Sequence, residues 1–262
     1  MVELVKHLKG TQDAYNALSG GGGGYSADTL YFTTEFSGDN GLNAGRIYLG
    51  GTLVGKPSVW EELPEPLPEF AVDLGLPSGR LWADRNVGAA SPESYGDYFM
   101  WGSTEPDTDS VCDWAHAPFN GGSSSFDEEY FKANSGTWLN ADFTLKPEYD
   151  AAHVIMGGSW RMPTSAEMQE LLDGTTQTVE TLNGVKGMRF TSKSNGNSIF
   201  IPLAGIRFGS NVYDMGVYGF AWSSSLSAGN ASRSHNLHFS LNGDAIVNNL
   251  SRYGGFDVRG VC

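Results

Sequence analysis

The chain has 262 residues and a formal net charge of −14, and 40% of its residues are hydrophobic. That is enough for one large folded domain with a smaller second unit, and the acidic balance argues against nucleic acid as a partner, because phosphate binding needs clustered Lys and Arg. Two cysteines, Cys112 and Cys262, are too few for a disulfide framework or a metal cluster, although one bridge between them stays open. Neither a classical signal peptide nor a bilayer-spanning apolar run is visible, so we expect no membrane insertion.

Residues 1–57 predict a small module made of a helix and a hairpin. Val2, Val5 and Leu8 have roughly helical spacing, and the glycine run at 20–24 favours a flexible break. Two strand-like runs follow, TLYFTTEF and GRIYLGGTLVG, and together they predict the hairpin. We expect residues 58–69 to form a proline-rich linker.

Residues 70–262 predict an α+β domain with a twisted antiparallel sheet and long loops. The run VDLGLPSGRLWADRNVGA indicates a hairpin, and YGDYFMWG indicates a further strand. One helix is expected after Thr164, where Glu167 completes a capping box, with Gly174 as its stop. Short strands separated by turns are expected from there to Cys262.

Motifs for catalysis or metal binding are weak. GGTLVGKP at 50–57 nearly matches a phosphate-binding loop, but Pro57 lacks the hydroxyl that would hold Mg²⁺, so a hairpin end is the better interpretation. His235 and His238 are three residues apart on an expected strand and should lie on opposite faces, which argues against a shared metal. His153 is expected to be packed or hydrogen-bonded.

The tryptophans are expected to be structural rather than catalytic or sugar-binding. Trp101, Trp160 and Trp222 stand among small and apolar residues, as core anchors do. With no nucleophile, base or ligand signature in view, we expect no enzyme activity, no cofactor and no metal.

The composition changes near the C-terminus. The last 69 residues contain no Lys, Glu or Gln, whereas the first 193 contain 24. At that rate the last 69 residues should contain about 9 Lys, Glu or Gln residues. If each position were drawn independently, the probability of finding none would be about one in ten thousand. Loop-rich β structure explains part of the deficit. The genetic code offers a sharper explanation, because AAC codons randomised at both adenines can encode Asn, Ser, Tyr, Asp, His, Arg or Phe but never Lys, Glu or Gln.

Several blocks, in order along residues 70–262, resemble one family. VDLGLPSGRLWADRNVGA, YGDYFMWGSTEP, DAAHVIMGGSWRMPTSAEMQELL, NSIFIPLAGIR, GFAWSSSL and RYGGFDVRGVC are similar to the Bacteroidetes and Fibrobacter paralogous domain, which has a C-type lectin fold. The ending resembles the variable region of proteins diversified by retroelements, of which phage tropism determinants are the known type. DTLYFTTEF and GRIYLGGTLVG are similar to the attachment module of tail proteins from phages of gut Bacteroides.

The resemblance implies a non-enzymatic receptor-binding protein of a phage tail or bacterial cell surface, whose variable region covers about 205–262. It implies an unidentified cell-surface protein or glycan as ligand, and a homotrimer built through the N-terminal module. Two alternatives stay open: a bacterial adhesin of the same fold that is not diversified, and a relative of formylglycine-generating enzymes. For the second, neither Cys112 nor Cys262 reproduces a reactive pair.

The resemblance also implies a fixed scaffold with variable positions between its members. The scaffold comprises Gly205, Arg207, Gly216, Gly219, Trp222, Ser223, Ser224, Arg252, Phe256 and Arg259. The nominated ligand-binding positions are Phe208, Tyr213, Asp214, Val217, Tyr218, Phe220, Ala221, Arg233, His235, His238, Ser240, Leu250 and Ser251. We expect these thirteen to cluster on one exposed face, although burial is the competing expectation for Val217, Phe220 and Leu250.

Overall fold

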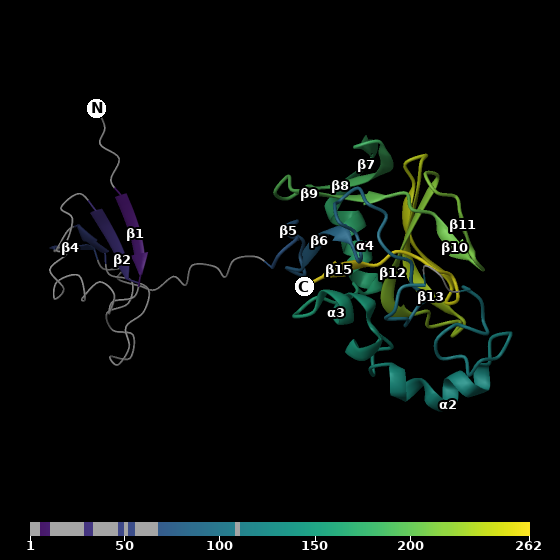
Figure 1. Cartoon of the computed structure of the whole chain (residues 1–262). Coiled ribbons are helices and arrows are strands. Elements are labelled where there is room, and N and C mark those ends of the chain that lie inside the picture. Colours follow the sequence, from purple (N-terminus) through teal and green to yellow (C-terminus); the bar gives the residue numbers. More distant parts are fainter. Residues whose placement is uncertain (1–5, 11–28, 34–46, 50–51, 56–67, 108–110) are drawn as a thin grey trace. The chain divides into compact units, whose positions relative to one another are not determined.

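The computed structural model describes residues 6–10, 29–33, 47–49, 52–55, 68–107 and 111–262 (Figure 1). The chain divides into two compact units, Met1–Pro66 and Leu67–Cys262. The expected glycine break and residues 58–67 of the expected linker lie outside the described residues. No helix in the described part of the chain is long and apolar enough to span a membrane.

The first unit contains one four-stranded sheet. Strand β1 (Lys6–Gly10) pairs in parallel with β2 (Thr29–Thr33), and antiparallel pairs join β2 to β3 (Ile47–Leu49) and β3 to β4 (Thr52–Gly55). The expected hairpin is confirmed, and the strands flanking Gly50 and Gly51 pair with each other, as a hairpin end requires. The expected helix is wrong at Lys6–Gly10, where pairing with β2 outweighs a weak helical spacing.

The second unit contains four sheets and three α-helices among its described residues. Its strands are β5 (Ala71–Asp73), β6 (Leu81–Asn86), β7 (Thr175–Leu182), β8 (Val185–Ser192), β9 (Ser198–Pro202), β10 (Ile206–Phe208), β11 (Asn211–Tyr213), β12 (Tyr218–Leu226), β13 (Arg233–Ser240), β14 (Ala245–Ser251) and β15 (Arg259–Val261). They form the sheets β15-β6-β5, β7-β8-β9, β10-β11 and β12-β13-β14, and every strand pair is antiparallel. The fold is mixed α and β with mostly antiparallel sheets and few helices, as an α+β domain requires.

The helices are α2 (Glu128–Trp138), α3 (Ala151–Met156) and α4 (Ser165–Gly174), with one 3₁₀ turn at Pro147–Tyr149. The β5–β6 hairpin and α4 confirm the sequence prediction. The expectation of a single helix is wrong, because α2 and α3 also form. The expected strand at YGDYFMWG is wrong as well: only Phe99 pairs, in an isolated bridge with Phe256.

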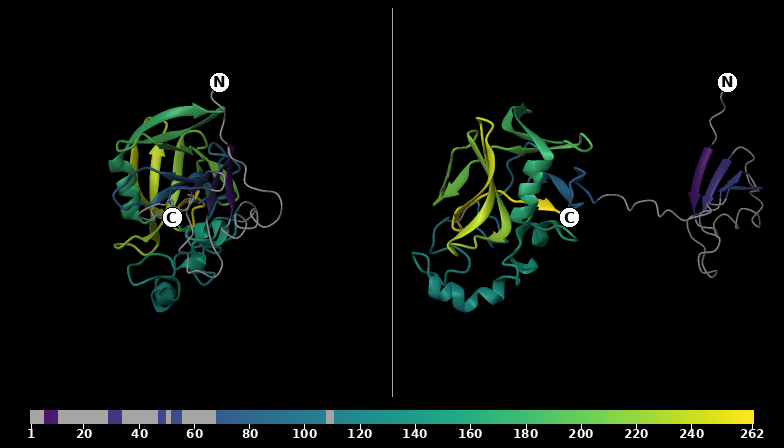
Figure 2. Two further views of the ribbon diagram at one scale, coloured as in Figure 1. Left: turned by 90° about the vertical axis from the view of Figure 1, so that its left-hand side faces the viewer. Right: turned by 180° about the vertical axis from the view of Figure 1, so that it is seen from behind.

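Two hydrophobic clusters flank the sheet β12-β13-β14. One gathers around Trp222 and Phe256, and the other lies where Leu237 and Phe239 meet α4. Figure 2 shows α4 beside the strands of this sheet, and Figure 1 shows α2 at the opposite edge of the unit from β7. The central residues of β12 and β13 therefore lie between two packed cores, whereas no residue of β14 is buried.

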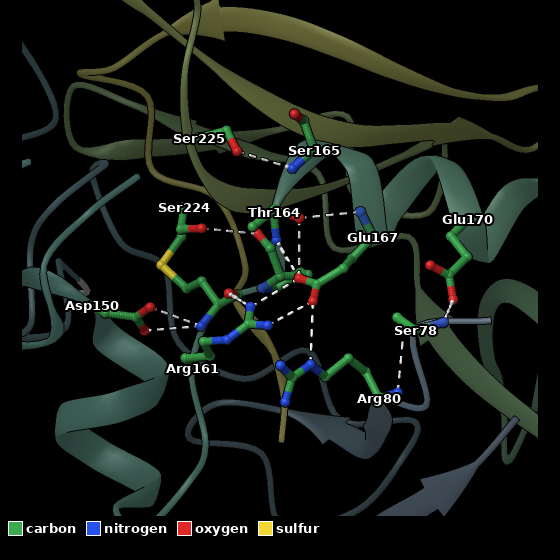
Figure 3. A network of polar contacts seen from close by, with 12 residues as sticks. Ser78, Arg80, Asp150, Arg161, Thr164, Ser165, Glu167, Glu170, Ser224 and Ser225 are labelled. Carbon is green, nitrogen blue, oxygen red and sulfur yellow. Dashed lines mark hydrogen bonds and ion pairs between the residues drawn. The ribbon is translucent and has the colours of Figure 1, made fainter. Parts of the chain in front are cut away.

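A polar network fixes the start of α4 (Figure 3). The backbone N–H of Glu167 donates to Thr164 Oγ1 at 3.2 Å, while Glu167 Oε2 accepts from the Thr164 N–H at 2.8 Å, which completes the expected capping box. Arg161 donates to both carboxylate oxygens of Glu167, at 2.8 and 2.6 Å. Burial opposes ionisation of Glu167, but these bonds lower its pKa overall. The Ser165 N–H also donates to Ser225 Oγ at 3.0 Å, so α4 is tied directly to β12.

Candidate functional site

Strands β12, β13 and β14 carry most of the nominated positions, and their register decides which way each residue faces. Phe220 pairs with His238, and His238 pairs with Ile246, so the three form a row across one face. The neighbouring row, which includes Leu237 and Val247, points to the opposite face because side chains alternate along a strand. We call these the His238 face and the Leu237 face.

The Leu237 face is closed over its central part. Leu237 and Phe239 are buried and pack in one cluster with Met168 and Leu171 of α4. Ala221 of β12 belongs to the same cluster. A ligand therefore has no access to this part of the sheet, and the open surface must be sought on the His238 face and at the ends of the strands.

A chain of aromatic rings runs along the His238 face into the core. The ring of His238 lies 4.8 Å from that of Phe220, with an interplanar angle of 2°, and 5.5 Å from that of Tyr218. Phe220 contacts Phe256 at 5.1 Å, and Phe256 stacks on Trp222 at 4.0 Å. Such ring pairs add packing energy beyond simple burial, so they hold the backbone of β12 and β13 firmly.

Strand β13 also places polar groups on this face. Ser234 Oγ, both amide atoms of Asn236 and Nε2 of His238 are buried, and none has a hydrogen-bond partner among the described residues. Burial lowers the pKa of His238, and the charge of Asp244 opposes the shift. Because Ser234 and Asn236 are fully buried, a ligand cannot reach their polar atoms, and on β13 this face is open to solvent only around the half-buried His238.

Most of the nominated residues keep contact with solvent. Four are exposed, namely Tyr213, Asp214, Val217 and Arg233. Six are half-buried, namely Phe208, Tyr218, His235, His238, Leu250 and Ser251. Of the ten scaffold residues, nine are buried and Gly216 is half-buried. The residues assigned to the scaffold therefore lie inside, and most of those assigned to the variable set lie at the surface.

Three nominated residues are buried: Phe220, Ala221 and Ser240. Phe220 and Ala221 are adjacent on β12, so their side chains point to opposite faces of the sheet. The aromatic chain encloses Phe220 on one face, and α4 covers Ala221 on the other. Ser240 ends β13 beneath the turn to β14, where its backbone N–H bonds Asp244 O at 2.9 Å. These three cannot contact a ligand in this conformation.

The expectation of a single exposed face is also wrong. Tyr218, His238 and Leu250 lie on the His238 face, whereas Arg233, His235 and Ser251 alternate to the other side. The sequence correctly predicts that His235 and His238 lie on opposite faces. The same alternation means that the nominated residues of β13 cannot all share one face, a consequence that the expectation of one exposed face did not take into account. Phe208, Tyr213, Asp214 and Val217 belong to the β10–β11 ribbon and the turn that leads into β12.

The nominated set also missed exposed apolar residues near its own members. Met215, Leu241 and Ile246 are each more than a third exposed, and they lie in the turns and strand ends around Tyr218. Met cannot arise from the randomised AAC codon, and apolar residues were expected inside. These three residues could have been identified by their closeness to turns, because each lies within a few residues of Gly216 or Gly243.

One cavity, of about 300 Å³, lies at the connection from β12 to β13, where residues 226–231 face Phe131 of α2, and others lie farther from the nominated positions. Another cavity, of about 520 Å³, is lined by Phe70, Arg85 and Trp160 among others. A polar one of about 390 Å³ lies beside the α4 network and includes Asp150 and His153. Both polar residues have structural roles: Asp150 accepts the N–H groups of His153 and Met162, and His153 Nδ1 contacts Trp160 O at 3.1 Å. The expectation that His153 is hydrogen-bonded is confirmed.

The tryptophans and cysteines also have defined surroundings. Trp101, Trp160 and Trp222 are buried, which confirms their expected place in the core. Cys112 and Cys262 are both free thiols. Burial raises the pKa of Cys112 to about 12, with Asp107 adding to the shift, so its thiol is protonated and shielded. Among the described residues, no group of three or more His, Cys, Asp or Glu side chains is arranged to hold a metal ion.

Comparison of the chain with family models, curated proteins and solved structures finds no match.

Proposed function

We propose that this chain is a non-enzymatic ligand-binding protein whose C-terminal segment, about 205–262, presents a diversified surface on a rigid scaffold of the C-type lectin type. The sequence blocks that resemble the Bacteroidetes and Fibrobacter paralogous domain support this assignment. The α+β architecture with mostly antiparallel sheets is compatible with it.

One observation carries the proposal: the scaffold residues are buried and most of the interleaved variable residues are not. Nine of ten scaffold positions are buried, whereas ten of thirteen nominated positions keep solvent contact. Substitutions at accessible sites away from special backbone conformations change stability by about 0.5 kcal/mol or less, while buried aromatic positions tolerate little. Such a division lets one surface vary while the fold stays the same.

The scaffold itself has the rigidity that such a surface needs. Trp222 Nε1 donates to the Phe99 carbonyl at 2.9 Å, and its ring stacks on Phe256. Arg259 is fully buried, and its guanidinium bonds Asn86 Oδ1 and the carbonyls of Ala83 and Phe200. Anchored side chains of this kind let a binding surface keep its geometry when neighbours change.

The enzymatic alternative has less support. A formylglycine-generating type of chemistry requires a reactive thiol, and the Cys112 thiol is 1% exposed with a raised pKa. A thiolate nucleophile is correspondingly disfavoured at this position.

We further propose that the protein works on a phage tail that infects gut Bacteroides, with an N-terminal module that attaches it and assembles a homotrimer. The similarity of DTLYFTTEF and GRIYLGGTLVG to tail attachment modules is the basis. A bacterial adhesin without diversification is the second candidate. A near-copy of the tail-coding DNA beside a reverse transcriptase gene would favour the diversified protein, and its absence would favour the adhesin.

The proposal is tested with two libraries of the full chain. One randomises the accessible nominated positions that lie outside the hydrophobic clusters and the aromatic stack and have ordinary backbone conformations, namely Tyr213, Val217, Arg233, His235 and Ser251, and the matched library randomises Phe220, Ala221 and Ser240. The first should keep melting temperatures close to the parent while adsorption to a panel of Bacteroides strains changes. The second should lose folded protein, because its positions are buried. If variants of the first library melt far below the parent, or all keep one shared ligand, the segment is a fixed structural element.

A further inference from the structure

One face of α2 lines the cavity of about 300 Å³ beside the connection from β12 to β13. The lining residues of α2 and its C-cap are spaced three or four apart, so they form one stripe along the helix. They are Glu128, Phe131, Lys132, Ser135 and Leu139. Residues 226–231 form the facing wall. A cavity of this volume is at the small end of ligand sites and has room for one large side chain.

Hydrogen bonds and packing hold both walls in place. The Leu226 N–H donates to Phe143 O at 3.0 Å. Behind the cavity, Arg252 Nε donates to Ala231 O at 2.8 Å, and the Arg252 guanidinium lies 4.5 Å from the ring centre of Phe131. Because Arg252 is fully buried, it fixes one residue of each wall to the core. Walls fixed in this way lose little conformational entropy when a ligand enters.

The lining of the cavity is mainly apolar and carries no unbalanced charge. Its apolar side chains are Phe131, Leu139, Phe143, Leu226, Ala228 and Ala231. Its two charged side chains, Glu128 and Lys132, pair with each other at 2.6 Å. Ser135 Oγ donates to Lys132 O at 3.3 Å, and Asn230 Oδ1 accepts from the N–H and the hydroxyl of Ser232. These contacts leave few polar groups free to recognise a charged or hydroxyl-rich ligand.

Phe143, at the mouth of the cavity, has a strained backbone and an exposed ring. Its φ is +61°, in the left-handed region that bulky residues rarely adopt, and its side chain is 60% exposed. Phe119 has a similar φ of +63°, but its ring stacks on Trp138 at 4.5 Å. Phe143 has no such ring contact within the part of the chain that the structure describes. Backbone strain of this kind is concentrated at ligand-binding sites, where a bound group can supply the missing contact.

We propose that this cavity binds one neutral apolar side chain, aromatic or large aliphatic, that protrudes from a partner protein. The inference rests on the proposed function and names the chemistry of one contact of its ligand. The volume suits one such side chain, the paired charges of Glu128 and Lys132 disfavour an ionic group, and the Phe143 ring offers a stacking surface.

The two walls have different parts in this recognition. Residues 226–231 lie in the segment proposed above to vary, and a randomised AAC codon can encode each of them. The residues of α2 lie outside that segment. Variation of one wall would therefore change which side chain fits, while Phe131 and Leu139 keep the other wall apolar.

The first test titrates the purified full chain with N-acetyl-tryptophanamide, a neutral indole probe, and detects binding by ligand-observed NMR. The dissociation constant should be about 0.1 to 1 mM, as is usual for a ligand of this size. N-acetyl-lysinamide and methyl β-glucoside are the matched charged and sugar probes, and neither should bind. Failure of the indole probe to bind, or tighter binding of either matched probe, would overturn the assignment.

Two variants separate the cavity from the stability of the fold. Phe143→Asn places a residue that tolerates positive φ, so the melting temperature should not fall, while probe binding weakens about fivefold through loss of the ring. Ala228→Phe, at an exposed position, fills the cavity and should abolish probe binding in a chain that stays folded.

Phe70→Asn is the matched control for Phe143→Asn. Phe70 is also exposed and has φ +70°, but it does not line this cavity, so its replacement should leave probe binding unchanged. Equal weakening by Phe70→Asn and Phe143→Asn would place the probe elsewhere and overturn the proposal. Binding that survives Ala228→Phe unchanged would overturn it as well.

The source of the side chain is tested by adsorption of the labelled full chain to Bacteroides strains. N-acetyl-tryptophanamide should compete with adsorption, and Phe143→Asn should weaken adsorption about fivefold, whereas Phe70→Asn should not. Treatment of the cells with proteinase K should abolish adsorption, and periodate oxidation of their glycans should not. Adsorption that survives proteinase K but is lost after periodate would overturn the partner protein.

Failure of this inference can be distinguished from failure of the proposed function. If adsorption is indifferent to the probe and to Phe143→Asn and Ala228→Phe, yet changes across the library of accessible nominated positions, the cavity inference is wrong and the proposed function stands. Adsorption to no strain would overturn both.

Discussion

The imidazole ring of His238 lies flat on the phenyl ring of Phe220, with ring centroids 4.8 Å apart. This stacked pair lies at the solvent-exposed end of the aromatic chain, next to Tyr218, and the negative charge of Asp244 acts on His238. A neutral imidazole fits this place better than a charged one, since burial lowers the pKa of His238.

The free energy of unfolding should therefore decrease at acidic pH, in part because protonation of His238 favours the unfolded chain. The folded pKa is depressed below the unfolded value of about 6.5, so the unfolded chain binds the proton first as the pH falls. The contribution of His238 is fully present above that value and is lost as the pH falls toward the folded pKa. His238→Phe keeps an aromatic ring on Phe220 and removes the titration. Thermal melts between pH 5 and 8 should show a smaller acid loss in the variant, and an unchanged loss would contradict the assignment.

Trp222→Ala should destabilise the second unit by about 3 to 5 kcal/mol, as for other buried aromatic deletions. Trp222 is fully buried, stacks on Phe256 at 4.0 Å and donates to the Phe99 carbonyl. Trp222→Phe is the control: it keeps a ring on Phe256, and the Phe99 carbonyl still accepts from the Phe256 N–H at 3.0 Å. Urea unfolding followed by near-ultraviolet circular dichroism measures both. If Trp222→Ala and Trp222→Phe lowered the free energy of unfolding equally, packing of the Trp222 ring on Phe256 would not be its main contribution to stability.

Arg259→Met should cost about 3 to 5 kcal/mol, because it removes the buried donor to Asn86 Oδ1 and to the carbonyls of Ala83 and Phe200, together with a positive charge that favours ionised Asp257. Burial raises the pKa of Asp257, and Arg259 opposes that shift. Adding Asp257→Asn should recover part of the loss, since no carboxylate is then buried. The exposed Arg233→Met is the matched control and should change the unfolding free energy by no more than roughly 0.5 kcal/mol. A double variant no more stable than Arg259→Met would contradict this account.

The two thiols should react with Ellman's reagent at different rates. Cys262 is half-buried, whereas Cys112 is 1% exposed and its pKa is raised to about 12. Cys262 should react first, and Cys112 should react only as fast as the unit opens. Cys262→Ser removes the fast phase and identifies it. Rapid reaction of Cys112 in the folded chain would reopen the enzymatic alternative.

Local signals predicted part of this fold. The capping box at Thr164 identified α4 because both of its members lie within one helical turn. Helix α2 was missed, although Asp127 caps it and Glu128 begins it, because weak helix formers follow. The burial of Phe131 and Trp138 stabilises that helix, and burial depends on residues distant in sequence.

The strands that carry the nominated residues could be predicted from the sequence, but the direction in which each nominated side chain points could not. The composition of the tail marked the segment, and the strand pattern located its elements. Which side each residue faces depends on register, and whether a side is open depends on what covers it. Phe220 and Ala221 are adjacent and both buried, because Phe256 covers one side of β12 and α4 covers the other. No periodicity within β12 itself carries that information.

Strand β15 is a structural part of the core. Val261 is fully buried, and Leu81 and Cys262 exchange two backbone hydrogen bonds, at 3.1 and 3.0 Å. During synthesis the second unit therefore cannot close until translation has passed Val261. A frameshift or early stop anywhere upstream yields a product with an open core, which proteases degrade. Formation of the closed core therefore requires translation in frame through β15.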